Sequence, residues 1–151
     1  MKAAWMQQPP RDALGVIPHD HEEIQATDKL VRYIPSVHVK LEGGVPKLSS
    51  AAFTPSTPPD DPRSSVSVDI KSLLVAEGLF EPYRASSGQG VAELPVDKVR
   101  GYGLMVGWDP LPKNSSHGGI WGVGKSKSKQ RQLSRDCAIL VILPSMQDEN
   151  N

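Results

Sequence analysis

The stretch GVAELPVDKVRGYGLMVGWDPLPKNSSHGGIWGV, residues 90–123, decides the fold that we expect. It begins with two predicted strands, residues 90–96 and 100–108, around a turn near Asp97-Lys98. A loop with two prolines, residues 109–119, leads to a short third strand at 120–123. Short strands that follow one another in this way are typical of a mainly antiparallel sheet.

Alternating apolar side chains predict further strands before this stretch. Val37, Val39 and Leu41 would share one face of a strand that starts near Pro35, and the chain would return as a second strand up to Thr54. The segment SSVSVDI repeats the pattern, with Val66, Val68 and Ile70 facing inward and Ser65, Ser67 and Asp69 facing outward.

The segments that follow supply the helices and the last strand. A helix is expected within residues 69–81, and residues 126–137 are compatible with a second helix whose clear apolar anchor is Leu133. The apolar run at 138–143 predicts a final strand. Six or seven short strands with one or two helices predict an α+β fold, built on a mainly antiparallel, curved sheet or partial barrel.

The expected organisation is one folded domain with loose ends. We place a single α+β domain at residues 30–144 and expect a disordered, polar tail at 145–151. Residues 1–29 are broken by prolines and are predicted to form a flexible N-terminal arm, with one turn of helix near its end. Trp5 and Met6 in this arm could become ordered on the surface of a partner.

Composition excludes some classes of protein. The 151 residues carry 17 basic and 17 acidic side chains, and this balance argues mildly against a dedicated nucleic-acid binder. The single cysteine, Cys137, excludes an internal disulfide and is predicted to be buried, which suits the cytoplasm. The longest apolar run, residues 137–144, is far shorter than the ~20 residues of a membrane span, so we expect no contact with a membrane.

Motifs for metals and cofactors are absent from the sequence. There is no C-x-x-C pair, no H-E-x-x-H and no phosphate-binding loop, so we predict neither a metal nor a cofactor. The nearest approach to a metal cluster is HDHEE, with His19 and His21. It lies in the predicted arm without a third ligand on a rigid element, and we interpret it as solvated acidic chain.

His117 is the main candidate for chemistry. A stiff loop with two prolines precedes it, and Gly118 and Gly119 follow, which lets a ligand or another backbone approach closely. This is how an acid–base or binding group would be presented. In the other interpretation, the histidine ends a loop and the glycines form a bulge.

A basic run follows the histidine loop. It comprises Lys125, Lys127, Lys129, Arg131 and Arg135, without an acidic residue between them. On a helix these charges would spread around the surface, so contacts to phosphates would be few, weak and strongly dependent on salt. Nucleic acid is therefore a possible partner.

Four short elements resemble an uncharacterised family of small bacterial proteins. They are Ser50-Ala51-Ala52-Phe53-Thr54-Pro55, Ser67-Val68, Asp109-Pro110, and Asn114 with His117. The resemblance implies a bacterial, cytoplasmic protein, and families of this kind often lie in defence or mobile-element gene neighbourhoods. This chain departs from the pattern by inserting Ser115-Ser116 and by having Gly118 in place of alanine, which puts a fixed Asn–His geometry in doubt.

The order of elements also has a loose likeness to small ADP-ribosyltransferase folds. That likeness would give roles to Arg32 or His38 on an early strand, and to Ser67 and His117 on later ones. No specific motif supports it.

Three functions stay open at this point. The leading prediction is a non-enzymatic accessory or interaction subunit, with a protein partner or a second copy of itself. The first alternative is an enzyme that processes nucleotides or nucleic acid, with His117 as the acid–base group and residues 125–135 holding phosphates. The second alternative is a weak nucleic-acid-binding module that uses the same basic run.

Overall fold

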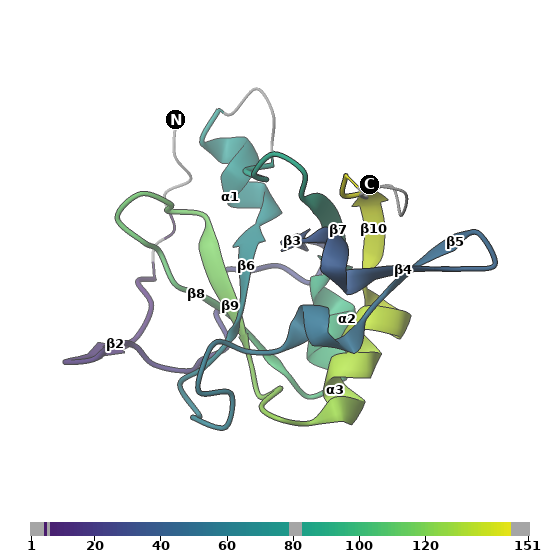
Figure 1. Ribbon diagram of the computed structural model, residues 1–151. Coiled ribbons are helices and arrows are strands. Elements are labelled where there is room, and N and C mark those ends of the chain that lie inside the picture. The colour runs from purple at the N-terminus through teal and green to yellow at the C-terminus, as the bar shows by residue number, and fades with distance from the viewer. Residues whose placement is uncertain (1–4, 6, 79–82, 146–151) are drawn as a thin grey trace.

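A six-stranded open sheet forms the centre of the protein (Figure 1). The computed structural model describes residues 5, 7–78 and 83–145. All neighbouring strands of the sheet are antiparallel, and their order is β10-β7-β3-β6-β9-β8. The strands are β3 (Lys29–Ile34), β6 (Val66–Ile70), β7 (Gly90–Pro95), β8 (Met105–Trp108), β9 (His117–Trp121) and β10 (Ile139–Ile142).

Smaller elements surround this sheet. Two hairpins pair β1 (Arg11–Asp12) with β2 (Gly15–Val16), and β4 (Val39–Glu42) with β5 (Val45–Leu48). The described α-helices are α1 (Lys71–Ala76), α2 (Val96–Gly101) and α3 (Lys127–Arg131), with 3-10 turns η1 (Ser36–His38) and η2 (Ser50–Phe53). A π-helical turn, η3 (Gln132–Cys137), continues α3. The predicted α+β class and antiparallel sheet are confirmed, although the sheet does not close into a barrel and the helices exceed the predicted one or two.

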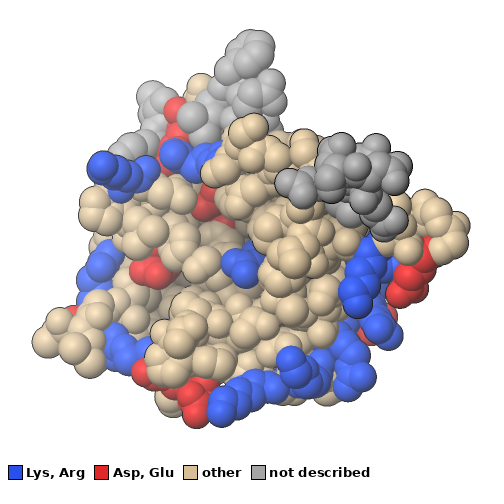
Figure 2. Space-filling model, in the orientation of Figure 1, with Lys and Arg blue, Asp and Glu red and all other residues tan. Residues whose placement is uncertain are grey.

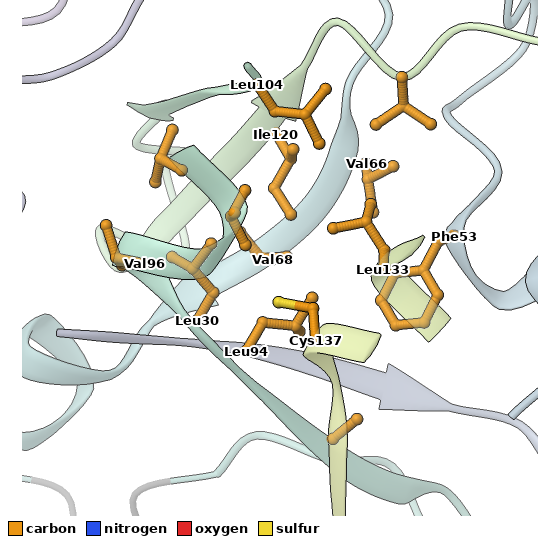
Figure 3. Packing of buried hydrophobic residues seen from close by; sticks show 14 of the residues in the cluster. Leu30, Phe53, Val66, Val68, Leu94, Val96, Leu104, Ile120, Leu133 and Cys137 are labelled. Atoms are coloured by element: carbon orange, nitrogen blue, oxygen red, sulfur yellow. The ribbon is translucent and has the colours of Figure 1, made fainter. Parts of the chain in front are cut away.

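The main core lies on one face of the sheet, beneath α2, η2 and η3. Figure 3 shows Phe53 from η2 and Leu133 and Cys137 from η3 packed toward strand residues such as Val68 and Leu94. Phe53, Leu94 and Leu133 are fully buried. Cys137 is buried as predicted, and burial raises the pKa of its thiol to about 11, which keeps it protonated and unreactive.

The other face has a smaller apolar cover and several polar residues. Leu74 of α1 packs on Val31 and Val91 of the sheet. Because strand residues alternate between faces, Asp69 and His117 lie on this same face, opposite the main core. This face therefore carries Asp69 and His117, together with Tyr33 of β3.

The predicted turn at Asp97-Lys98 is wrong. The chain forms helix α2 there, and strands β7 and β8 do not pair, since β3, β6 and β9 lie between them. Val96 and Val99 are three residues apart and both fully buried, so one turn of helix places both in the core. The helix carries the chain from β7 to the far edge of the sheet.

The predicted strand pair at 35–54 is also corrected. Its first residues form η1, where Val37 is 76% exposed. The β4–β5 hairpin follows and extends from the body of the protein, at the right of Figure 1, with Leu41 61% exposed. Its return strand ends at Leu48, and the chain then turns into η2, which buries Phe53. The strand that enters the sheet is β3, which lies earlier and has apolar residues on both faces instead of a simple alternation.

The predicted N-terminal arm is packed against the domain over its described residues. The main-chain N–H of His21 donates to the carbonyl of Val106 at 2.8 Å, and the Val106 N–H donates to the Asp20 carboxylate at 2.9 Å. These bonds cover the outer edge of β8, and Ile24 is 1% exposed. The expected turn of helix is absent from residues 21–31, which instead run into β3. Met6 and residues 146–151 of the predicted tail lie outside the described residues.

Within the described part of the chain, no helix has the length and apolar character that crossing a bilayer requires.

Candidate functional site

His117 begins β9 and faces a carboxylate. Its Nδ1 lies 2.8 Å from the main-chain oxygen of Asp109 and 3.4 Å from the Oδ2 of the same residue. Its side chain is 15% exposed. Burial disfavours the charged ring, but the carboxylate and carbonyl of Asp109 outweigh burial and raise the pKa of His117 above its usual value. The ring is therefore oriented, and it takes up a proton more readily than a free imidazole does.

The two glycines after His117 have a packing role. Neither has a positive φ angle. A β-carbon at position 118 would lie 2.7 Å from the carbonyl oxygen of Gly107, and one at position 119 would lie 2.7 Å from the Ser65 hydroxyl. The close approach predicted for this pair is therefore made by the protein's own chain.

A buried carboxylate lies next to His117 on the neighbouring strand. Asp69 pairs in register with His117 and is 2% exposed, whereas the sequence predicted that it would face solvent. It accepts hydrogen bonds from the Tyr33 hydroxyl at 2.5 Å and from the Asn114 amide at 2.8 Å, and these partners offset the cost of its burial. Burial and the bond to Asp69 raise the pKa of Tyr33. The structure thus brings Asn114 and His117 together around Asp69.

Arg32 and His38 do not join this group. The Arg32 guanidinium donates to the carbonyls of Ala52, at 3.1 Å, and Ser67, at 2.7 Å, on the main-core face of the sheet. It therefore ties η2 to β6, which is a structural role. His38 lies in η1, which packs against η2.

A hollow of about 510 Å³ opens beside His117. Asp109, Ser67 and Trp121 line it, together with two cations, Arg11 and Arg63. Arg63 is already engaged, because it makes two bonds of 2.8 and 2.9 Å to the carboxylate of Asp12. None of the lysines of the basic run lines this hollow.

The imidazole of His117 has no hydrogen-bonded nucleophile in the part of the chain that the structure describes. Among the described residues, no serine or cysteine is hydrogen-bonded to His117. The site can therefore orient an imidazole and hold a proton, but it does not form the pair of nucleophile and base that covalent catalysis needs.

The HDHEE histidines are bound to the backbone. Nδ1 of His19 donates to the carbonyl of Ile17, and its Nε2 accepts from the N–H of Trp108 at 3.2 Å. Nε2 of His21 donates to the carbonyl of Gln7, and its Nδ1 accepts from the N–H of Glu23. With both nitrogens of each ring occupied, neither histidine can bind a metal as it stands. No three His, Cys, Asp or Glu side chains among the described residues are grouped to hold a metal ion.

Trp5 packs on its own chain. Its ring stacks on His21 with centroids 5.0 Å apart and meets the ring of Trp108 edge-on at 5.1 Å. The residue predicted to dock on a partner is thus used to hold the N-terminal segment against β8.

The structure divides the basic run. Lys125 pairs with Asp60 at 3.5 Å, and the Lys129 ammonium donates to the carbonyl of Tyr102 at 2.5 Å. Lys127, Arg131 and Arg135 are exposed and follow one side of α3 and η3.

The chain matches no protein-family model, no curated protein and no solved structure. The resemblance to a small bacterial family therefore stays a prediction.

Titration of His19 and titration of His117 should change the free energy of unfolding with pH in opposite directions. Burial lowers the pKa of His19, so the unfolded chain takes up its proton first and stability should fall as pH drops from about 6.5 through the folded pKa. The raised pKa of His117 stabilises the fold below about 6.5, and this contribution is lost as pH rises through its folded pKa. Urea unfolding between about pH 5 and about pH 8 checks both, with His19→Gln and His117→Gln as variants that do not titrate. The same pH profile for both variants would contradict the assignment.

Proposed function

We propose that this protein is a non-enzymatic interaction subunit whose working form is a homodimer joined through β10. The observation that carries the proposal is the exposed apolar surface of this edge strand and the residue after it. Ile139 is 58% exposed, Val141 and Ile142 are each 44% exposed, and Leu143 is 54% exposed. Four large apolar side chains in five residues leave a patch of a kind that marks contact surfaces.

The backbone of β10 also supports pairing. β10 ends the sheet, with β7 on one side and no described strand on the other. A strand edge carries a row of N–H and C=O groups that another strand can satisfy, and proteins usually block such edges with charges or proline. Residues 139–142 contain neither.

A second copy of the chain is the occupant that the edge fits. Two identical strands pair antiparallel about a two-fold axis, so the surface complements itself, and the absence of charge removes repulsion between the copies. At the opposite edge of the sheet, residues 19–21 already cover β8. Pairing through one edge alone gives a closed dimer instead of a growing fibre.

The test is the mass of the particle in solution, measured by size exclusion with light scattering. The wild-type protein should run at twice the 16.4 kDa of the chain. Val141→Lys places a charge on the edge and should weaken dimerisation by about 100-fold or more, which corresponds to about 2.7 kcal/mol.

Val75→Lys is the matched control, because Val75 is 58% exposed on α1 and does not lie at this edge. It should leave the dimer intact. A wild-type monomer, or an equal loss from both lysine variants, would overturn the proposal.

One observation favours the enzyme alternative. The hydrogen bond from His117 to Asp109 orients an imidazole at a hollow, which is how an acid–base group is held. This alternative requires that His117→Ala abolish turnover of a nucleotide, a loss that a dimeric interaction subunit does not predict. Bacterial origin, cytoplasmic location and a link to defence stay proposals that rest on the family resemblance.

A further inference from the structure

A groove of about 590 Å³ runs between the β4–β5 hairpin and η3. Lys40 and Lys47 line it from the hairpin, and Arg135 lines it from η3. Glu42 is the one acidic residue of the lining within the part of the chain that the structure describes. The remaining polar lining consists of the hydroxyl residues Ser49, Ser50 and Ser134.

The three cations of the groove are available to a ligand. All three side chains belong to exposed residues, and none of them forms an ion pair with a described residue. By contrast, Lys71 and Lys125 elsewhere on the surface are each paired with a carboxylate. Positive charge in the groove is therefore neutralised only in part, by Glu42.

Two further cations extend the groove along α3. Lys127 and Arg131 are exposed on the side of the helix that leads to Arg135. Figure 2 shows Lys and Arg side chains along the bottom and up the right side of the molecule, and in Figure 1 α3 lies at the bottom and the hairpin at the right. The result is a path of positive charge on a protein whose net charge is zero.

We propose that this groove binds the phosphodiester backbone of a nucleic acid. Cations on two facing walls, with the hydroxyl residues Ser49 and Ser50 also lining the groove, suit a chain of successive phosphates. No aromatic side chain among the described residues lines the groove, so we expect no stacking of bases there and binding that is independent of sequence. The proposal does not depend on the β10 dimer.

This site differs from the basic run predicted from the sequence. Lys125 and Lys129 are engaged elsewhere, whereas Lys40 and Lys47 come from a hairpin almost 90 residues before Arg135. Few phosphate contacts are available, so we expect weak affinity that falls steeply with salt.

The experiment uses fluorescently labelled DNA of about 20 nucleotides, which is longer than the stretch that one single-strand-binding domain usually covers. The fluorescence anisotropy of this DNA is measured as full-length protein is added, and the titration is repeated at rising NaCl concentrations. Separate arms use a single strand and a duplex. The test variant is Lys40→Gln/Lys47→Gln/Arg135→Gln. The control variant removes three exposed cations from outside the groove through Arg11→Gln/Lys98→Gln/Lys113→Gln.

The test variant should bind about 10-fold more weakly or worse, and its slope of log affinity against log salt should be lower by about 2, since three phosphate contacts are lost. The control variant should keep the wild-type slope. The arm that binds more tightly shows whether the backbone is taken from a single strand or a duplex.

Three results would overturn the proposal. They are no binding at low salt, equal losses in the test and control variants, and equally tight groove-dependent binding of poly-glutamate, which would mark a site for acidic peptide. Circular dichroism of each variant shows that a loss of binding is not a loss of fold.

Discussion

Trp121→Ala is expected to lower the free energy of unfolding by about 4 kcal/mol, because it removes a large buried ring and leaves a cavity. Trp121 is 2% exposed at the end of β9. Its indole N–H donates to the carbonyl of Arg63 at 3.1 Å, and its ring lies 5.4 Å from the ring of His19, measured between centroids. One side chain thus joins the sheet, the segment that contains Arg63 and precedes β6, and the N-terminal segment.

Urea unfolding measures this loss, and the melting temperature should drop by roughly 10 °C. Trp121→Phe is the matched control. It keeps most of the apolar contact and loses the hydrogen bond, so it should cost about 1–2 kcal/mol. If Trp121→Ala lowered the free energy of unfolding no more than a surface substitution does, the result would contradict the packing of Trp121 against these three segments.

Gly107→Ala should lower the free energy of unfolding by about 3 kcal/mol, the upper part of the range for overpacking. A β-carbon at this position would lie 2.6 Å from the ring of Trp121 and 2.7 Å from the carbonyl oxygen of His19. Neither the backbone carbonyl of His19 nor the buried ring of Trp121 can move away from the added carbon at a small cost in free energy. We expect the N-terminal segment to move away from β8.

Limited proteolysis together with urea unfolding tests this expectation. The variant should be cleaved between residues 7 and 28 faster than the wild type. Gly101→Ala is the control, because nothing lies within 4 Å of a β-carbon there and its φ angle is not positive. It should be neutral or stabilising by up to about 1 kcal/mol. Equal effects from the two variants would show that residues 19–21 do not rest on β8.

Alternation in the sequence predicts a strand where the apolar residues all lie on one face. In β6, Val66, Val68 and Ile70 alternate and are all buried, as predicted. The central strand β3 escaped prediction because Val31 and Leu30 are buried on opposite faces, which removes the alternation. The sequence predicts a turn where helix α2 forms, because six residues are too few to show a helical period.

Sequence patterns predicted only the part of the site whose residues are neighbours in the sequence. His117 stood out because of the loop and glycines beside it, which are neighbours in sequence. Asp69 lies 36 residues from Tyr33 and 45 from Asn114, so its burial depends on partners that the fold brings together. An aspartate at an alternating position of a strand looks like a solvent-facing residue, and no local signal marks it as buried.

The proposed interaction surfaces depend on strand order. The apolar run at 138–143 predicts a strand, but an edge strand and a central strand have the same local pattern. Only the order β10-β7-β3-β6-β9-β8 shows that β10 ends the sheet. Likewise, Lys40 and Lys47 become part of a basic groove only because the hairpin faces η3.

Pairing of β10 with a second copy of itself is tested most directly by NMR on a mixed sample of isotope-labelled and unlabelled protein. Isotope-filtered spectra of this sample record only those nuclear Overhauser effects that arise between a labelled copy and an unlabelled copy. We predict intermolecular effects that involve the methyl groups of Ile139, Val141 and Ile142 and are lost in Val141→Lys. A dimer whose intermolecular effects arise from another surface, or a sample with none at all, would contradict the proposal.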